Sequence, residues 1–220
     1  MRVIDNYLGV DKNKNLKKLM ESSDFMWLAG DTDINSKELF NFQFSHIFYR
    51  DNYINSNYFK NLNDLITKIK PLSLIRIKAN LNSITHKIVK YPKHVDQKFK
   101  CKIAIYYVNN NNGYTVIDGK KIDSKQDRIV FFNSEKEHYG TSSTNCNNRM
   151  IINFKAINFL SSYIKKNRIN LVYTNTSTIL SGAVAARKNK IPSLFHVHEI
   201  PFGDKMYEFF SGYMVNRSSD

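Results

Sequence analysis

The sequence of 220 residues is poor in cysteine, glycine and proline, and it lacks long apolar runs. Its two cysteines, Cys101 and Cys146, cannot build a disulfide framework and do not have the spacing of a zinc site. A reducing, cytoplasmic setting is therefore expected. No apolar segment approaches the roughly 18 residues that span a membrane, and the N-terminus lacks the apolar block of a signal peptide. These absences predict a protein with no membrane partner.

Acidic residues are also scarce. Asp and Glu total 19 against 33 Lys and Arg, so the formal net charge is +14 and the sequence pI is about 9.6. That excess suggests a polyanionic partner such as nucleic acid. The cations are spread along the chain, however, and Lys, Asn, Ile, Tyr and Phe are abundant together, as an AT-rich genome would encode. We therefore attribute the charge to background composition rather than to a dedicated nucleic-acid site.

The sequence does contain a substantial apolar fraction, arranged in short segments. Hydrophobic residues make up 42% of the chain, enough for a packed core. Over residues 1–155, apolar stretches alternate with turn signals such as Asp118-Gly119, and a helical stripe at 56–70 ends at Pro71. The clearest strands are expected at residues 72–81, 84–90, 101–108, 128–132 and 149–155. This pattern predicts a mainly β fold with flanking helices, a double-sheet jelly roll (double-stranded β-helix) rather than a parallel α/β fold.

The expected strand at 72–81 has an unusual polar face. A period of two puts Arg76, Lys78 and Asn80 on one side of it and apolar residues on the other. One interpretation is that this face borders a cavity, where Arg76 or Asn80 helps to bind a charged ligand. The other is that the face is exposed to solvent, and the sequence favours neither. We expect residues 84–90 to fold back and pair with this strand.

The motif that most clearly indicates chemistry is His94-Val95-Asp96. On an extended chain, side chains two residues apart point the same way, so this imidazole and this carboxylate share a face. A second histidine, His138, on a neighbouring strand would complete one face of an octahedron. Two histidines and one carboxylate in that arrangement leave three positions of Fe(II) open for a co-substrate and dioxygen.

Arg149 is the expected partner of an acidic co-substrate. It follows His138 by 11 residues, one further strand along the chain, and it shares a strand face with Ile151 and Asn153. A guanidinium binds a carboxylate through two parallel hydrogen bonds. Where that strand borders the site, Arg149 suits the distal carboxylate of a dicarboxylic keto acid such as 2-oxoglutarate.

These motifs form part of a longer ordered set. Over about residues 1–155 the chain resembles the iron(II)/2-oxoglutarate-dependent dioxygenases, in particular their prolyl-4-hydroxylase-like, phage-type branch. The segments that carry the resemblance are FQFSH (42–46), LIRIKANL (74–81), HVD (94–96), AIYYVN (104–109), GYT (113–115), RIVFF (128–132), HYGT (138–141) and RMIINF (149–154). Each of them falls on a strand or loop where that family would need it.

The resemblance implies an enzyme and two sets of site residues. These are His94, Asp96 and His138 for Fe(II), and Arg149, Asn80 and Arg76 for 2-oxoglutarate. It also implies an oxidation, most simply a hydroxylation, in which dioxygen is consumed and 2-oxoglutarate is converted to succinate, and it admits ascorbate as an accessory reductant. The substrate stays open between a prolyl or other protein side chain, a small metabolite and a glycan-linked molecule.

The pattern changes over residues 156–220. Helices are expected at 157–166 and 178–188, and strands at 169–173 and 192–197. This order of elements is typical of a parallel βαβ unit. This stretch resembles the start of the N-terminal Rossmann-like domain of family-4-type glycosyltransferases, on the segments VYTNTS (172–177), GAVAA (182–186) and HVHEIPFG (196–203). We expect two domains, 1–155 and 156–220, the second of them a partial one that lacks the nucleotide-sugar half of that family.

Other classes of function compete with an iron enzyme. One is a non-catalytic binding module associated with glycosyltransferase activity, which predicts a triad that binds no iron. Another is a basic nucleic-acid-binding protein, which predicts strongly salt-dependent binding. Oxidative demethylation of nucleobases needs a nucleotide-recognition lid with stacking aromatic residues, and we find no such lid before His94.

Overall fold

The computed structural model describes residues 1–31, 42–71, 73–96, 101–157, 163–165, 167–175 and 181–196 of the chain. The chain divides into two compact units, Met1–Ala156 and Ile157–Asp220. The first unit holds every candidate site residue that the sequence analysis names.

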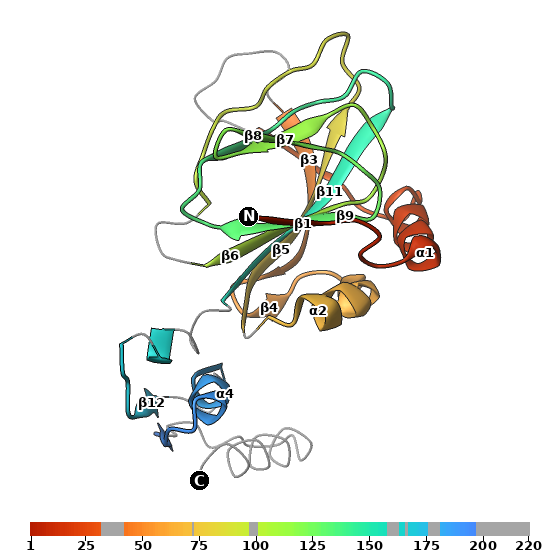
Figure 1. Ribbon diagram of the computed structural model, residues 1–220. Coiled ribbons are helices and arrows are strands. Elements are labelled where there is room, and N and C mark those ends of the chain that lie inside the picture. The colour runs from red at the N-terminus through yellow and green to blue at the C-terminus, as the bar shows by residue number, and fades with distance from the viewer. Residues whose placement is uncertain are drawn as a thin grey trace. The chain divides into compact units, whose positions relative to one another are not determined.

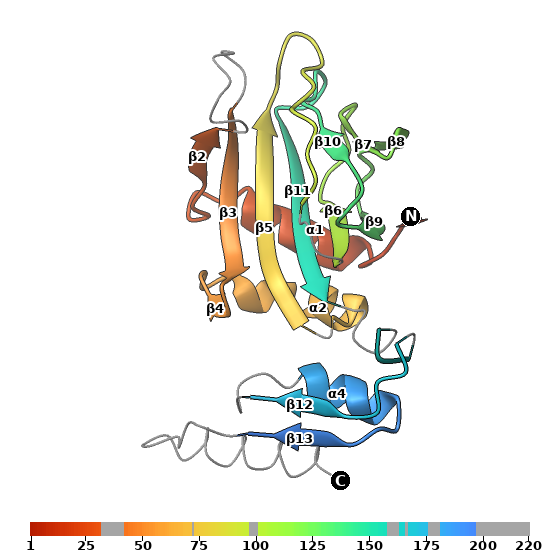
Figure 2. The same cartoon turned by 90° about the vertical axis from the view of Figure 1, so that its left-hand side faces the viewer.

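Within the described residues, eight strands of the first unit form one antiparallel sheet. They are β1 (Arg2–Ile4), β2 (Leu28–Asp31), β3 (Phe42–Arg50), β4 (Tyr53–Ile54), β5 (Ser73–Ser83), β6 (Lys102–Tyr107), β9 (Arg128–Asn133) and β11 (Asn148–Ile157). Their order is β1-β9-β6-β11-β5-β3-β2, with β4 paired to β3. Figure 2 shows β2, β3, β5 and β11 side by side. Most neighbours are distant in sequence, so the topology is that of a jelly roll rather than a chain of hairpins.

A smaller antiparallel sheet completes the jelly roll (Figure 1). Its strands are β7 (Tyr114–Ile117), β8 (Lys120–Asp123) and β10 (His138–Gly140), in the order β10-β7-β8. The β7–β8 hairpin turns at Asp118 and Gly119, whose φ angles are 51° and 78°. Two successive positive φ angles are what a type I′ turn requires, and Asp-Gly adopts it readily. The mainly β, double-sheet architecture predicted from the sequence is therefore present.

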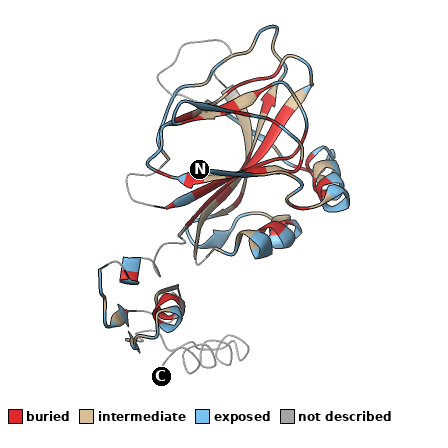
Figure 3. Ribbon diagram, in the orientation of Figure 1, coloured by how far each residue is buried: buried red, intermediate tan, exposed pale blue. Residues whose placement is uncertain are grey.

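Two helices and a 3-10 turn cover the face of the large sheet that points away from the small one. They are α1 (Val10–Met20), η1 (Phe59–Leu62) and α2 (Asn63–Ile69). Leu16 and Met20, one helical turn apart, are buried on α1 beside Leu62 and Leu65 in one core cluster. Figure 3 shows the buried residues concentrated on the central strands between these helices and the small sheet.

The alternation of side chains divides each central strand between two environments. On β6, Ala104 and Tyr106 belong to the core under the helices, whereas Ile103, Ile105 and Tyr107 belong to the core between the two sheets. On β11 the same alternation sends the residues at 150, 152 and 154 towards the helices. The intervening residues of β11 therefore face the space between the sheets, which is where the candidate site lies.

The N-terminal segment is anchored by one buried carboxylate. Asp127 accepts hydrogen bonds from the backbone N–H groups of Leu8 (2.6 Å) and Gly9 (2.8 Å) and from the hydroxyl of Tyr106 (2.9 Å). These bonds connect the start of α1 to the edge of β9 and to the centre of β6. They fix the two residues that lead into α1, a helix with no side-chain cap at its N-terminus.

A second acidic residue secures β1. Asp5 accepts hydrogen bonds from the guanidinium of Arg128 at 2.6 and 3.1 Å and from the ammonium of Lys125 at 2.8 Å. These charge-assisted bonds hold the pKa of the Asp5 carboxyl well below its usual range, and the bond from Arg128 has the largest effect. Arg128 is the first residue of β9, and the next residue, Ile129, pairs with Ile4 at the end of β1.

One expectation about local structure differs from the fold. Residues 84–90 do not form a strand that pairs with β5. They cross to the far side of the cavity, where Ile84 bridges Ser143 and Lys90 bridges Thr141. The neighbours of β5 are β3 and β11 instead. Pairing with strands distant in sequence is decided by packing across the whole sheet, so no short-range pattern encodes it.

The second unit contains a parallel strand pair. Strands β12 (Val172–Thr174) and β13 (Ser193–Phe195) pair in parallel, and helix α4 (Ser181–Lys188) lies between them in sequence. This is the strand–helix–strand unit that the sequence predicts. Residues 176–180 and 197–220, which include much of the glycosyltransferase-like segment at 196–203, lie outside the described residues. No helix among the described residues is long and apolar enough to cross a membrane.

Candidate metal centre

The two histidines of the predicted triad are brought together by strand pairing. His94 and His138 form an antiparallel bridge in which each backbone N–H donates to the other residue's carbonyl, at 3.0 and 2.9 Å. Directly opposed residues in such a pair project their side chains to the same face. The two ring centroids consequently lie 4.5 Å apart. The bridge explains how a residue in an irregular segment and a residue of β10 reach one site.

Both imidazoles are oriented by backbone carbonyls. Nδ1 of His94 lies 3.1 Å from the carbonyl oxygen of Pro92, and Nδ1 of His138 lies 3.0 Å from that of Lys136. A carbonyl only accepts, so each neutral ring carries its proton on Nδ1 and leaves the lone pair of Nε2 for a ligand. Burial lowers the pKa of His94, which favours this neutral, metal-binding form.

Asp96 supplies the carboxylate of the cluster. Its side chain is 4% exposed, and its Oδ2 lies 3.3 Å from Nε2 of His138. The ammonium of Lys155 contacts Oδ1, which also lies 3.8 Å from the guanidinium of Arg76. Burial alone would raise the pKa of the Asp96 carboxyl, but His138 and Lys155 outweigh it and hold that pKa well below its usual range. The carboxylate is therefore ionised and ready to bind a cation.

These three side chains fit a metal ion. One ligand atom from each of His94, Asp96 and His138 lies within 4.8 Å of the other two. The Oδ2 atom of Asp96 is buried, has no hydrogen-bond partner of good geometry among the described residues, and lies 3.3 Å from Nε2 of His138. A cation shared between these two atoms, either a proton or a metal ion, would satisfy both of them. Two neutral nitrogens and one carboxylate oxygen form the ligand set that non-haem Fe(II) prefers when further positions stay open.

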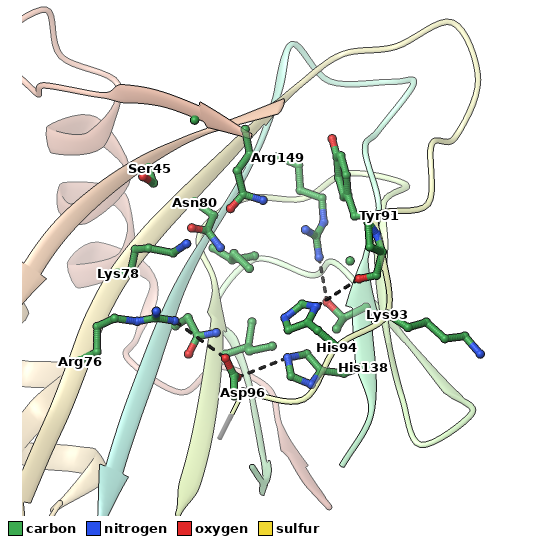
Figure 4. Close-up of a pocket in the computed structure, with 18 residues that line it drawn as sticks. Ser45, Arg76, Lys78, Asn80, Tyr91, Lys93, His94, Asp96, His138 and Arg149 are labelled. Carbon is green, nitrogen blue, oxygen red and sulfur yellow. Dashed lines mark hydrogen bonds and ion pairs between the residues drawn. The ribbon is translucent and has the colours of Figure 1, made fainter. Parts of the chain in front are cut away.

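The cluster opens into a cavity of about 450 Å³ between the two sheets (Figure 4). That volume lies within the range of small-molecule sites. The side chains that line it come mainly from β3, β5, β11 and the segment before the first histidine. They include Ser45, Arg76, Lys78, Asn80, Tyr91, His94, Asp96, Thr115, His138, Arg149, Ile151 and Asn153. All six candidate site residues named from the sequence therefore border one space.

Arg149 is the largest of the almost fully buried side chains, with 1% of its surface exposed. Its Nε donates to the Ser124 hydroxyl and its terminal nitrogen to the Thr115 hydroxyl, each at 2.9 Å, and its guanidinium carbon lies 5.8 Å from the centre of the Tyr107 ring. No carboxylate among the described residues pairs with it. A buried guanidinium whose side-chain hydrogen bonds among the described residues go to neutral hydroxyls is suited to an acidic ligand.

Gly113 leaves the space that the Arg149 side chain occupies. A Cβ atom at position 113 would lie 2.6 Å from Cδ of Arg149 and 2.6 Å from the carbonyl oxygen of Ser142. Neither atom can withdraw, because the first belongs to a buried side chain and the second to the backbone. The glycine of the GYT segment is thus required by a close approach to the cation.

The polar face of β5 borders the cavity, so of the two interpretations of that face the solvent-exposed one is wrong. Figure 4 shows Arg76, Lys78 and Asn80 reaching inward from one side, with Tyr91 and His94 on the other. Burial, followed by repulsion from neighbouring cations, lowers the pKa of Lys78 to about 8. The face is thus cationic and partly dehydrated.

Two residues of this site were not predicted as site residues. Lys155 contacts the Asp96 carboxylate and donates to the Asp96 backbone carbonyl at 3.2 Å. Lys155 follows Arg149 by six residues on β11, so the two-residue period of a strand puts both side chains on the same face. That spacing is the sequence signal for Lys155. Lys78 lies on the polar face of β5 between the candidates Arg76 and Asn80. The alternation of these polar residues with apolar ones is the sequence signal that could have identified it.

His46, the histidine of the FQFSH segment, lies outside this cavity lining. Its Nδ1 and Nε2 are each 2.7 Å from a partner, the Met26 carbonyl oxygen and the Ser56 hydroxyl. Both ring nitrogens are therefore used in packing β3 against neighbouring loops. His46 is no metal ligand in this structure.

Comparisons with known proteins identify the fold. No protein-family model matches the sequence, and no curated protein matches it. Among solved structures, a prolyl hydroxylase in complex with a hypoxia-inducible-factor oxygen-degradation-domain peptide fragment, from Trichoplax adhaerens, superposes with a TM-score of 0.53 at 13% identity, over 70% of this chain and 82% of that one. The non-haem α-ketoglutarate-dependent epimerase SnoN from nogalamycin biosynthesis superposes with a TM-score of 0.54 at 8% identity, over 70% and 77%. The chain thus shares the fold of Fe(II)/2-oxoglutarate oxygenases and carries a His-Asp-His cluster within it.

Proposed function

We propose that this protein is a non-haem Fe(II)/2-oxoglutarate-dependent dioxygenase, and most simply a hydroxylase. The observation that carries the proposal is one cavity that contains both a two-histidine, one-carboxylate cluster and a buried guanidinium with no acidic partner among the described residues. The first is suited to a metal with free positions, and the second to the far end of a dianionic co-substrate. The fold shared with a prolyl hydroxylase and an epimerase of this chemistry supports it.

In this proposal His94, Asp96 and His138 hold Fe(II). Iron and 2-oxoglutarate together supply the activation of dioxygen and the oxidation of a substrate C–H bond, with ascorbate as an accessory reductant. The protein supplies orientation. The Pro92 and Lys136 carbonyls fix the two rings, and Lys155 steadies the carboxylate.

Arg149 binds the distal carboxylate of 2-oxoglutarate in this proposal. Ser124 and Thr115 hold the guanidinium in place, so its remaining N–H groups meet an anion without further ordering of the side chain. Asn80 and Arg76 line the same cavity from β5, and the sequence analysis makes them secondary candidates for the co-substrate. A hydrogen bond from Asn80 to 2-oxoglutarate is compatible with its position between Lys78 and Arg149 in Figure 4.

We propose that this activity belongs to residues 1–155 and that residues 156–220 form a separate, partial Rossmann-like domain. The parallel β12–β13 pair supports an α/β character for the second domain. Its likeness to glycosyltransferases rests on the sequence segments alone. Two free cysteines, one of them buried, agree with a reducing, cytoplasmic setting that keeps iron ferrous.

The test is anaerobic binding of Fe(II) and 2-oxoglutarate, followed by the weak visible metal-to-ligand charge-transfer band. We expect the band in the wild type, its loss in His94→Ala and its weakening in Arg149→Ala. His86→Ala, at an exposed histidine outside the cavity lining, is the matched control and should keep the band. Absence of the band from folded wild-type protein would exclude the dioxygenase and favour the binding-module alternative. Strongly salt-dependent binding of nucleic acid by that protein would instead favour a nucleic-acid-binding function.

A further inference from the structure

The cavity contains more positive charge than iron and 2-oxoglutarate account for. Four cations line it, Arg76, Lys78, Lys93 and Arg149, against the single carboxylate of Asp96. Fe(II) and the 2-oxoglutarate dianion carry equal and opposite charge, so their binding leaves this excess unchanged. Burying unpaired cations is costly, and the excess therefore calls for another anion.

Lys78 and Arg76 are the cations that this further anion would meet. Among the described residues, Lys78 has no hydrogen bond and no ion pair. Arg76 is 3.8 Å from Asp96, a carboxylate that Lys155 and His138 approach more closely, and its Nε is buried without a hydrogen-bond partner. Lys93, by contrast, pairs with Glu137 at 3.6 Å and points away from the cavity in Figure 4.

Neutral polar groups extend the same surface. The side-chain oxygens of Asn80 on β5 and Asn153 on β11 are buried, belong to residues that line the cavity, and have no hydrogen-bond partner in the part of the chain that the structure describes. Both are acceptors, so they suit hydroxyl or amide N–H groups that lie next to an acidic group in one molecule. The unsatisfied groups thus describe a ligand with an anionic end and donor groups beside it.

We propose that Arg76 and Lys78 form a second anion site, which binds a carboxylate or phosphate group of a small-molecule substrate. This assignment rests on the proposed dioxygenase function, and it moves Arg76 from the co-substrate to the substrate. Arg149 is the better partner for 2-oxoglutarate, because its guanidinium is anchored by two hydroxyls and is fully buried. The lowered pKa of Lys78 is the expected mark of a cation whose counterion arrives with the ligand.

The cavity size agrees with a small molecule. At about 450 Å³ it accommodates a co-substrate and a compact acid. A neutral prolyl side chain would leave Lys78 unpaired. The site therefore selects for an acidic substrate.

The test measures anion binding to protein already loaded anaerobically with Fe(II) and 2-oxoglutarate. Methyl phosphate and acetate are titrated calorimetrically while the charge-transfer band is followed. We expect one equivalent of at least one probe to bind, with a dissociation constant raised about tenfold or more in Lys78→Met and Arg76→Met, since a charge-assisted hydrogen bond is lost. The tighter probe distinguishes a phosphorylated from a carboxylated substrate.

Two further variants and one spectroscopic readout keep the result interpretable. Lys78→Arg retains the charge and should bind within about threefold of the wild type, as should Lys93→Met, which removes a nearby cation outside the proposed site. An unchanged band shows that 2-oxoglutarate has not been displaced. Absence of anion binding while the band is present, or equal losses in Lys93→Met and Lys78→Met, would overturn the second anion site and leave the dioxygenase standing. Absence of the band would instead refute the proposed function.

Discussion

Replacing Lys78 by methionine should stabilise the metal-free protein at neutral pH. The Lys78 side chain is partly buried on β5, and Arg76 and Lys155 add repulsion, so its pKa falls from 10.5 to about 8. Asp96 is the one nearby group that opposes this shift. Methionine keeps an unbranched stem of similar length in the same space and removes the charge.

The magnitude follows from linkage between protonation and folding. A shift of that size corresponds to about 3 kcal/mol of lost stability while the lysine is protonated, at roughly 1.4 kcal/mol per pKa unit. Water in the cavity screens part of this cost, so we expect Lys78→Met to gain about 1–2 kcal/mol at pH 7. Because the folded pKa lies below the unfolded one, the cost is fully present below pH 8. It is relieved as the pH rises from about 8 towards 10.5, where the folded protein loses the proton first.

The assay is urea unfolding in EDTA at several pH values from 7 to 10.5, for the wild type, Lys78→Met and the exposed control Lys121→Met. The free-energy gap between the first two proteins should be largest at pH 7 and shrink as the pH rises. Other titrating groups are common to all three proteins and cancel in the difference. A gap that is independent of pH, or a Lys78→Met variant that is less stable at pH 7, would refute the argument.

Three further predictions concern the supports of the site and of the fold. Gly113→Ala should cost about 1–3 kcal/mol by urea unfolding and weaken 2-oxoglutarate binding, because the added methyl displaces Arg149; normal affinity would contradict the close approach. Asp127→Asn should cost about 2–4 kcal/mol in the same assay, since an ionised acceptor of three hydrogen bonds is lost, and a loss under 1 kcal/mol would show that they contribute little. Asp5→Asn should cost about 1 kcal/mol at pH 7, because this half-exposed ion pair is screened. The lowered pKa of Asp5 makes its contribution fully present above about pH 4 and lost progressively as the pH falls, so this variant and the wild type should converge only below about pH 2.

The parts of the site that the sequence predicts are those with a local period. His94 and Asp96 share a face because they are two residues apart, and the alternation on β11 places Arg149, Ile151 and Asn153 along one side of the cavity. Such arguments depend only on the strand being extended, and they hold wherever the strand lies in the sheet.

The parts that could not be predicted depend on pairing between distant segments. The ion pair of Lys155 with Asp96 requires a particular placement of β11 against the loop that carries the carboxylate. The course of residues 84–90 likewise follows from bridges to residues 141 and 143 rather than from its own pattern. Register between strands far apart in sequence is decided by packing of the whole barrel, so no window of a few residues contains it.

The same distinction bears on the choice between the two interpretations of the β5 face. Alternation alone could not separate a solvated strand face from the wall of a charged cavity, because both put Arg76, Lys78 and Asn80 on one side. The sheet order decides, since β5 lies between β11 and β3 and its polar side looks into the space that holds the metal cluster. Without a ligand, protonated Lys78 lowers the stability of the fold, and it has no ion-pair partner among the described residues. An acidic ligand in the cavity would pair with this partly buried cation. The lost stability of the ligand-free protein and the affinity for an acidic substrate therefore both report the charge of Lys78.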